Sequence, residues 1–283
     1  MIVYLNGAWL PQENACIPIT DRGFLFSDGV FETARLHSGK FFRLHQHLDR
    51  FQQSARALEL AAPPSDELAL LAREAAERNR LAEASLRITL TRGSGGAGLK
   101  TRGAGRPTLL VTISAIAPDW EARAAQGWSL VTANTLRPSP DSVPAQLKAL
   151  GRVYAILAAL EAERAGVDDA LLLTAERKIA EGPTWNFFWR KGRVLRTASL
   201  AGGILEGVTR SIIIEIARRA GYQVEEGLWP RAELDTAEEA FATMTSLGVV
   251  PIRAIDGRAL ATDCAPQFQR RYWDLVGAEL RTS

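Results

Sequence analysis

The first part of the chain alternates between strand-like and helix-like patterns of apolar residues. Apolar runs on both sides of Asn6-Gly7 and Ser38-Gly39 predict two hairpins, over residues 2–10 and 31–44. A helix with one apolar face follows and ends before Pro63-Pro64. Its apolar positions are Leu44, Leu48, Phe51, Ala55 and Leu58. The other elements predicted here are a helix over residues 65–80 and strands over residues 85–91 and 107–115. This order is typical of an α+β domain.

After Pro118 the pattern changes, and strands are separated by helices. The predicted strands are 128–133, 170–174, 185–190 and 241–245, and the predicted helices are 150–165, 209–220 and 267–280. Gly166 and Gly221 follow two of these helices, as expected at helix ends. We therefore expect an N-terminal domain over residues 1–117, a linker over residues 118–126 and a C-terminal domain over residues 127–283.

Composition excludes several classes of protein. The 283 residues are 47% hydrophobic and 23% charged, which provides material for a sizeable core and excludes disordered and fibrous chains. A net charge of +2 gives no field that would attract nucleic acid or an anionic membrane, so we expect neither as a partner. No apolar stretch is long enough to cross a bilayer, and the first residues do not resemble a signal peptide. Two distant cysteines, Cys16 and Cys264, favour a reducing, cytoplasmic location.

Lysine chemistry is easy to search, because most of the basic residues are arginines. Four lysines lie in turns or polar connections and look solvated: Lys40, Lys100, Lys178 and Lys191. Lys148 instead lies within the apolar segment Ala-Gln-Leu-Lys-Ala-Leu-Gly. Apolar neighbours would desolvate its ammonium group, lower its pKa and favour the free amine that a Schiff base needs. The alternative is a surface lysine whose stem leans on apolar neighbours.

One segment has the form of a phosphate site at a helix N-terminus. Residues 202–210 read Gly-Gly-Ile-Leu-Glu-Gly-Val-Thr-Arg, so the amides of Gly207, Val208 and Thr209 and the hydroxyl of Thr209 would face an anion. An ordinary capped helix explains the same residues equally well. On the early helix, His47, Arg50 and Ser54 form a polar stripe from which Arg50 would reach an anion, unless it is simply solvated.

Other candidate sites are weaker. His37, His45 and His47 lack a cysteine or carboxylate at ligand spacing, so we expect no metal. The glycine-rich run over residues 93–98 lacks the Lys-Ser/Thr pair of a P-loop and is more typical of a mobile loop over a site. Glu181 precedes a predicted strand; if buried, its carboxylate would need a cationic partner such as a pyridinium nitrogen, and otherwise it is an exposed turn residue.

Six segments together, in this order, resemble the fold-type IV pyridoxal-phosphate enzymes. This family includes branched-chain aminotransferases, D-amino acid aminotransferases and 4-amino-4-deoxychorismate lyases. The resemblance spans nearly the whole chain. The segments are residues 21–32 (DRGFLFSDGVFE), 47–50 (HLDR), 147–150 (LKAL), 180–182 (AEG), 203–210 (GILEGVTR) and 243–246 (TMTS).

The resemblance implies a fold, a cofactor and roles for particular residues. The fold is of the α/β (α+β) class, with a small N-terminal α+β domain, a larger C-terminal α/β barrel-like domain and usually a homodimer. Lys148 would bind pyridoxal 5'-phosphate as a Schiff base and move the substrate proton, and Glu181 would pair with the pyridine nitrogen. The phosphate would be held by Arg50, Thr209, Thr245 and the amide of Val208. Candidate substrate-binding residues are Phe31, Thr33, Arg35, Arg87, Met244 and Ser246.

The resemblance leaves two activities open. Branched-chain enzymes tend to carry a tyrosine five residues after the lysine, where this chain has Val153 and then Tyr154. The arginine and histidine with which D-amino acid enzymes bind a carboxylate correspond to Ala97 and Leu99. The Gly-Val-Thr-Arg and Thr-Met-Thr segments favour a transaminase acting on an amino acid or amine and a 2-keto acid. The alternative is aminodeoxychorismate lyase, which releases pyruvate and forms 4-aminobenzoate.

Overall fold

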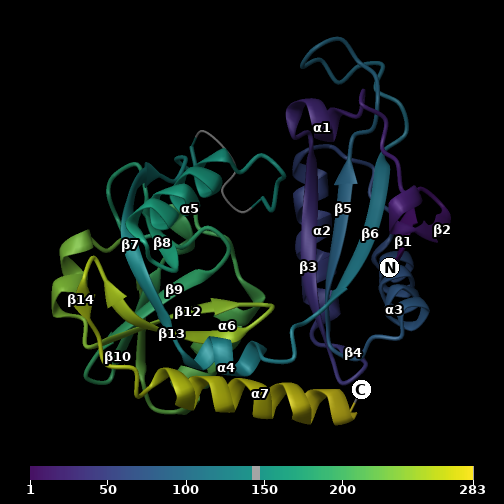
Figure 1. The fold of residues 1–283 in the computed structure, drawn as a ribbon. Helices are drawn as coiled ribbons and strands as arrows, with labels where there is room; N and C mark the ends of the chain where they lie inside the picture. The colour runs from purple at the N-terminus through teal and green to yellow at the C-terminus, as the bar shows by residue number, and fades with distance from the viewer. Residues whose placement is uncertain (142–146, 283) are drawn as a thin grey trace. The chain divides into compact units, whose positions relative to one another are not determined.

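The computed structural model describes residues 1–141 and 147–282, which form two compact units (Figure 1). The first unit contains Met1–Ala117 and Leu147–Gly151. The second contains the described residues of 118–141 and 152–282. Residues 118–126, which we expected to be a linker, lie in the second unit and include a helix. The segment Leu147–Gly151, which we expected in the C-terminal domain, belongs to the first unit.

The first unit is an antiparallel sheet with the strand order β2-β1-β6-β5-β3-β4, and its helices α2 and α3 pack on one face (Figure 1). Its strands are β1 (Ile2–Leu5), β2 (Ala8–Pro11), β3 (Gly29–His37), β4 (Lys40–Phe41), β5 (Ala84–Thr91) and β6 (Thr108–Ala115). Its helices are α1 (Arg22–Phe26), α2 (Leu44–Ala57) and α3 (Ser65–Asn79), with a 3-10 turn at Gln12–Asn14. The hairpins and both longer helices predicted from apolar patterns are confirmed.

The core of the first unit explains the direction of each β3 side chain. Val30, Ala34 and Leu36 alternate along β3 and pack with Leu48 and Phe51 of α2. Residues at the intervening positions point to the opposite face of the sheet, because side chains alternate along a strand. The face of β3 that meets α2 is therefore buried, and three of its four positions are apolar.

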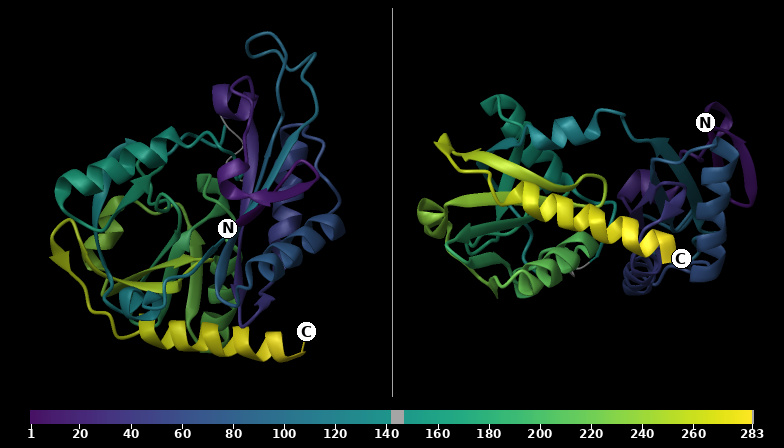
Figure 2. Two further views of the ribbon diagram at one scale, coloured as in Figure 1. Left: turned by 45° about the vertical axis from the view of Figure 1, so that its right-hand side comes forward. Right: turned by 90° about the horizontal axis from the view of Figure 1, so that it is seen from below.

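The second unit is built on a mixed sheet that curls into a half barrel (Figure 2). Its strand order is β11-β10-β9-β12-β13-β7-β8, and β14 pairs with β13. The strands are β7 (Trp128–Leu136), β8 (Asp169–Leu173), β9 (Asn186–Lys191), β10 (Val194–Ala198), β11 (Gln223–Gly227), β12 (Glu239–Met244), β13 (Gly248–Ile255) and β14 (Arg258–Ala259). The helices are α4 (Trp120–Ala125), α5 (Val153–Ala165), α6 (Val208–Arg219) and α7 (Ala265–Thr282), with 3-10 turns at Leu200–Gly202 and Arg231–Thr236.

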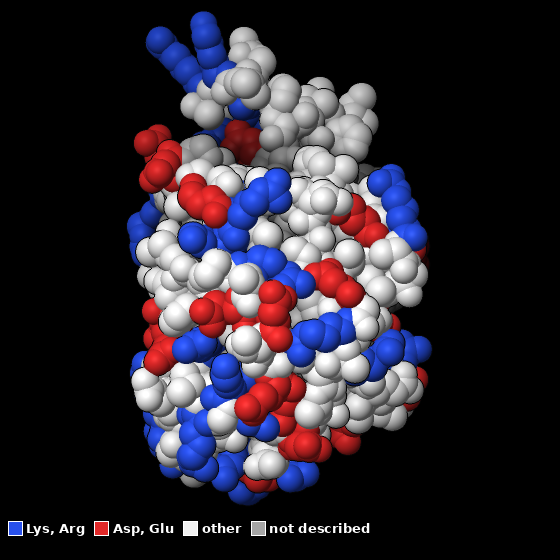
Figure 3. Space-filling model, turned by 90° about the vertical axis from the view of Figure 1, so that its left-hand side faces the viewer, with Lys and Arg blue, Asp and Glu red and all other residues white. Residues whose placement is uncertain are grey.

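Helices cover the second sheet. Helix α5 packs on β7 and β8, α6 on β11 and β12, and α7 on β13. Acidic and basic side chains are interspersed on the face drawn in Figure 3, in keeping with the small net charge. Within the described part of the chain, none of the helices combines the length and the hydropathy required to span a membrane.

Candidate active site

Lys148 lies on a short segment that pairs with the N-terminal end of β3. The amide of Phe31 donates to the carbonyl of Lys148 at 2.9 Å, and the amide of Leu150 donates to the carbonyl of Gly29 at 3.0 Å. The amide of Lys148 donates to Oγ of Ser54, on α2, at 3.2 Å. The backbone of Lys148 is therefore fixed from both β3 and α2.

The side chain of Lys148 is largely buried, at 14% exposed, and has charged as well as apolar neighbours. Its Nζ lies 3.6 Å from Oε1 of Glu32 and 5.2 Å from the centre of the Phe31 ring. The desolvation predicted from the apolar neighbours of Lys148 favours the free amine, but a carboxylate at this distance favours the ammonium form. Within the apolar segment around Lys148, Ala145 and Gln146 lie outside the described residues.

The polar stripe expected on α2 is buried rather than solvated. His47, Arg50 and Ser54 are 2%, 7% and 1% exposed. Arg50 donates from Nε and Nη2 to the two oxygens of Glu32, at 2.9 Å and 2.7 Å, and His47 Nδ1 lies 3.2 Å from Oε1. Burial by itself would raise the pKa of Glu32, but Arg50, Lys148 and His47 together hold it well below its usual range. Burial lowers the pKa of His47, and Glu32 offsets this only in part.

In the second unit, Glu181 is a buried carboxylate, at 4% exposed, and not an exposed turn residue. It accepts hydrogen bonds from Nδ2 of Asn186 at 2.9 Å and from the amide of Leu205 at 3.0 Å. Arg137 forms an ion pair with it and donates from Nε to the carbonyl of Gly203 at 2.6 Å. The cationic partner that burial requires is thus present within the chain.

Helix α6 begins at Val208, with Gly207 as its N-cap. Its first main-chain bond of the helical type runs from the amide of Ser211 to the carbonyl of Gly207, at 3.0 Å, so the preceding amides point out of the helix end. Val208 and Thr209 are buried. A Cβ on Gly207 would lie 2.0 Å from Oδ1 of Asn186, so this close approach requires glycine. Thr245 lies in the turn after β12, and the buried Oγ1 of Thr243 has no hydrogen-bond partner among the described residues.

The candidate substrate residues fall in both units. Phe31, Thr33 and Arg35 alternate on the face of β3 opposite to α2, and Arg87 of β5 pairs with Thr33 and stacks on Phe31 at 3.9 Å. Arg35 forms an ion pair with Glu83 at 2.6 Å. The remaining two candidates, Met244 and Ser246, lie at the end of β12 and in the turn that follows it.

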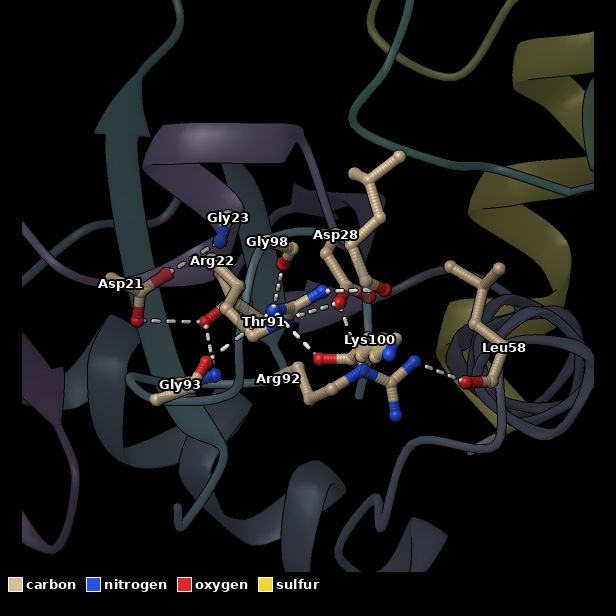
Figure 4. Close-up of polar contacts among 12 residues, drawn as sticks. Asp21, Arg22, Gly23, Asp28, Leu58, Thr91, Arg92, Gly93, Gly98 and Lys100 are labelled. Atoms are coloured by element: carbon tan, nitrogen blue, oxygen red, sulfur yellow. Dashed lines mark hydrogen bonds and ion pairs between the residues drawn. The ribbon is translucent and has the colours of Figure 1, made fainter. Parts of the chain in front are cut away.

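The glycine-rich loop after β5 is anchored by Arg22 (Figure 4). This side chain is 2% exposed and donates to loop carbonyls, at 2.8 Å for Gly98 and 3.3 Å for Lys100, and to Asp28 at 2.8 Å. Asp21 is also buried and accepts hydrogen bonds from Thr91, Thr108 and the amide of Gly23.

Within residues 1–141 and 147–282, no group of three or more His, Cys, Asp or Glu side chains is arranged to hold a metal ion.

Comparison with known proteins decides the family, because residues 29–255 match the model of amino-transferase class IV. The chain belongs to the class IV aminotransferases. This class IV aminotransferase is 34% identical over 261 residues to a Methanocaldococcus jannaschii protein assigned as a branched-chain-amino-acid aminotransferase, covering 92% of this chain and 90% of the relative. It is 30% identical over 258 residues to aminodeoxychorismate lyase of Bacillus subtilis, covering 90% of this chain and 87% of the relative.

A solved structure agrees with the sequence relatives. It is a T.th. branched-chain amino acid aminotransferase with pyridoxamine 5'-phosphate, which superposes with a TM-score of 0.91 and 30% identity and covers 97% of this chain and 93% of that one. The family and fold class predicted from the six segments are confirmed, as is pyridoxal phosphate as the cofactor of the family.

Three residues of this class IV aminotransferase that contact the predicted site residues were not predicted from the sequence. Glu32 contacts Lys148 and Arg50, and Arg137 and Asn186 contact Glu181. The sequence pattern could have identified Glu32, because it occupies a core-facing position in an otherwise apolar alternation on β3. No sequence pattern identifies Arg137, because its contact with Glu181 is formed only in the tertiary structure.

Proposed function

We propose that this protein moves an amino group between an amino acid or amine and a 2-keto acid, with pyridoxal phosphate bound to Lys148. The observation that carries this proposal is the environment of Lys148: its backbone is fixed by β3 and α2, and its Nζ lies near the Phe31 ring and near Glu32, which also binds Arg50. A lysine held in this way keeps its amine at one place, which a covalently bound cofactor requires.

The side chains of each unit fit parts of this cofactor. In the first unit, Arg50 and Lys148 both contact the carboxylate of Glu32, so the guanidinium of Arg50 is held beside the lysine, where an anionic group of the cofactor would bind. In the second unit, the open amides at the start of α6 suit a phosphate, and the hydroxyl of Thr243 is a donor that finds no acceptor within the described part of the chain. We assign Arg50, Thr209, Thr245 and the Val208 amide to the phosphate.

The bound cofactor supplies an electron sink for the carbanion formed at the substrate Cα. Lys148 would hold the cofactor and carry the proton at the substrate Cα. Glu181, kept in place by Asn186 and Arg137, would accept a hydrogen bond from the ring nitrogen. Arg87 would bind a substrate carboxylate; the other proposed substrate contacts are Phe31, Thr33, Arg35, Met244 and Ser246.

The experiment is a visible spectrum of the cofactor-loaded protein, followed by L- and D-amino acids without a keto acid. We expect one series to convert the cofactor to its pyridoxamine form. Lys148→Ala should abolish the lysine-bound absorbance and lower turnover by at least about 10³-fold, and Glu181→Gln should retain cofactor but slow turnover by about 10²-fold or more. Protein that cannot take up the cofactor would contradict the proposal. Loaded protein that ignores all amino acids would favour the lyase, as in the Bacillus subtilis relative.

We further propose a cytoplasmic homodimer. Both cysteines are free, in agreement with a reducing compartment. The first unit exposes large apolar side chains that a second copy would cover, and they are Ile17, Ile19, Phe24, Leu25, Phe26 and Leu99. We call these six residues the apolar patch.

A further inference from the structure

A carboxylate occupies a core position on β3. Val30, Ala34 and Leu36 fill the apolar layer between β3 and α2, and Glu32 takes the remaining position on that face with 1% of its surface exposed. Burying a charge at such a position is unfavourable unless other groups compensate it. The proposed reaction assigns no task to this residue.

One oxygen of Glu32 connects the cofactor lysine to the arginine assigned to the phosphate. Oε1 lies 2.7 Å from Nη2 of Arg50, 3.2 Å from Nδ1 of His47 and 3.6 Å from Nζ of Lys148. The amide of Thr33 donates to the same oxygen at 2.7 Å. Lys148 thus shares a carboxylate oxygen with Arg50, although the two cations come from different segments of the chain.

Among the described residues of the first unit, charged and titratable groups approach Lys148 from α2, β3 and β5. Helix α2 contributes Arg50 and His47, and β3 contributes Glu32. From β5, Arg87 stacks on the Phe31 ring that Nζ of Lys148 also approaches. Of these groups only Glu32 is an anion, so it is the one that favours a proton on the nitrogen of Lys148, whereas Arg50 and Arg87 oppose it.

We propose that Glu32 is a positioning residue that holds the nitrogen of Lys148 next to Arg50 and keeps that nitrogen protonated in the cofactor-bound protein. With the cofactor bound, a protonated Lys148 nitrogen would favour attack by an incoming substrate amine. The inference rests on the proposed function in one respect, that Lys148 is the cofactor lysine.

The experiment is a pH titration of the visible absorbance of the full-length, pyridoxal-phosphate-loaded protein. This absorbance depends on whether the lysine nitrogen bound to the cofactor is protonated. Glu32→Gln removes the charge and keeps the shape, and we expect it to lower the pH midpoint by about 1 to 3 units. Glu32→Asp keeps a carboxylate at a greater distance, and a smaller shift in the same direction is expected.

Glu83→Gln is the matched control. Glu83 also lies in the first unit and also binds an arginine and a histidine, Arg35 and His37, but it has no contact with Lys148. The pH midpoint of Glu83→Gln should equal that of the wild type. If the role of Glu32 were purely structural, Glu32→Gln would reduce stability without moving the pH midpoint of the absorbance. Cofactor content and thermal unfolding are therefore measured on the same variants.

The outcomes separate the two proposals. If the wild type takes up no cofactor, or shows no lysine-bound absorbance, the proposed function fails. If the wild type titrates but the midpoint is the same in folded Glu32→Gln, the role of Glu32 is overturned. Should Glu32→Gln not fold, an unchanged midpoint in Glu32→Asp overturns it instead.

Discussion

At the scale of single residues, the buried Glu32 and the half-buried Asp169 differ in what surrounds their carboxylates. Glu32 faces cations, whereas Asp169, at the start of β8, is bound by neutral donors. Nε1 of Trp185 donates to Asp169 at 2.6 Å and the amide of Ala170 at 2.8 Å. These bonds do not outweigh burial, which together with the nearby charge of Asp168 raises the pKa of Asp169.

Asp169→Asn should therefore change how stability depends on pH. Above pH 3.8, the ordinary value for this group, the folded wild type binds more protons than the unfolded chain until the raised pKa is passed. The contribution of Asp169 to the free energy of unfolding therefore decreases as the pH rises from 3.8 to the raised pKa. Asparagine does not titrate and still accepts from Trp185, so the variant should gain stability relative to the wild type as pH rises toward neutrality.

Urea unfolding between pH 3.5 and 7 measures this difference. Asp49→Asn, at an exposed position on α2, is the control and should leave the pH dependence unchanged. Parallel stability curves for wild type and Asp169→Asn would show that the prediction is wrong.

At the scale of elements, one side chain organises the loop between β5 and β6. Arg22 donates to the carbonyls of Gly95, Gly98, Leu99 and Lys100, and also to Asp28. A loop rich in glycine has high conformational entropy when unconstrained. Hydrogen bonds from a buried guanidinium offset that entropy, so the order of the loop depends on Arg22.

Arg22→Gln should free this loop while the sheet remains intact. Loss of charge-assisted hydrogen bonds worth about 1.5–3 kcal/mol predicts at least about tenfold faster amide exchange over residues 94–105. Hydrogen exchange followed by mass spectrometry measures it, with β5 and β6 as internal references. Arg102→Gln changes an exposed arginine of the same loop and should have no such effect. Equal exchange in both variants would contradict the anchoring role.

At the scale of the whole molecule, the apolar patch is the surface that we expect a second subunit to bury. Phe24 and Ile19 are 75% and 81% exposed, and Leu99 is 79% exposed. Leu99 lies next to residues 17–26 of the apolar patch, because its carbonyl accepts a hydrogen bond from Arg22 of that segment. Exposed apolar side chains of this size are common at subunit interfaces and costly in contact with water.

Phe24→Glu should weaken the proposed homodimer. Placing a charge within an apolar interface is expected to cost about 2 kcal/mol or more, which raises the dissociation constant about 30-fold or more. Sedimentation velocity over a range of concentrations measures the change. Leu70→Glu, at a position of α3 that is 58% exposed and outside the apolar patch, is the control. A monomeric wild type, or a variant that dimerises equally well, would refute this interface.

The pattern of apolar residues predicted the longer elements well and the short ones poorly. Helices α2, α3 and α7 and the first hairpin were expected near their observed positions. Helices α1 and α4, of five and six residues, were not predicted because so few turns give no periodicity. Strand β13 was also not recognised; it is buried through most of its length and lacks the alternation that marks a strand with one solvated face.

The sequence by itself determined the family and named Lys148 and Glu181, because the order of motifs and the local environment of a residue are properties of the chain. Only the tertiary structure decided what surrounds them. Glu32 meets Lys148 because residues 148–150 pair with β3, and Arg137 meets Glu181 across the second unit. Both partners are distant in sequence, and the strength of such contacts depends on burial and separation in space, which no local pattern records.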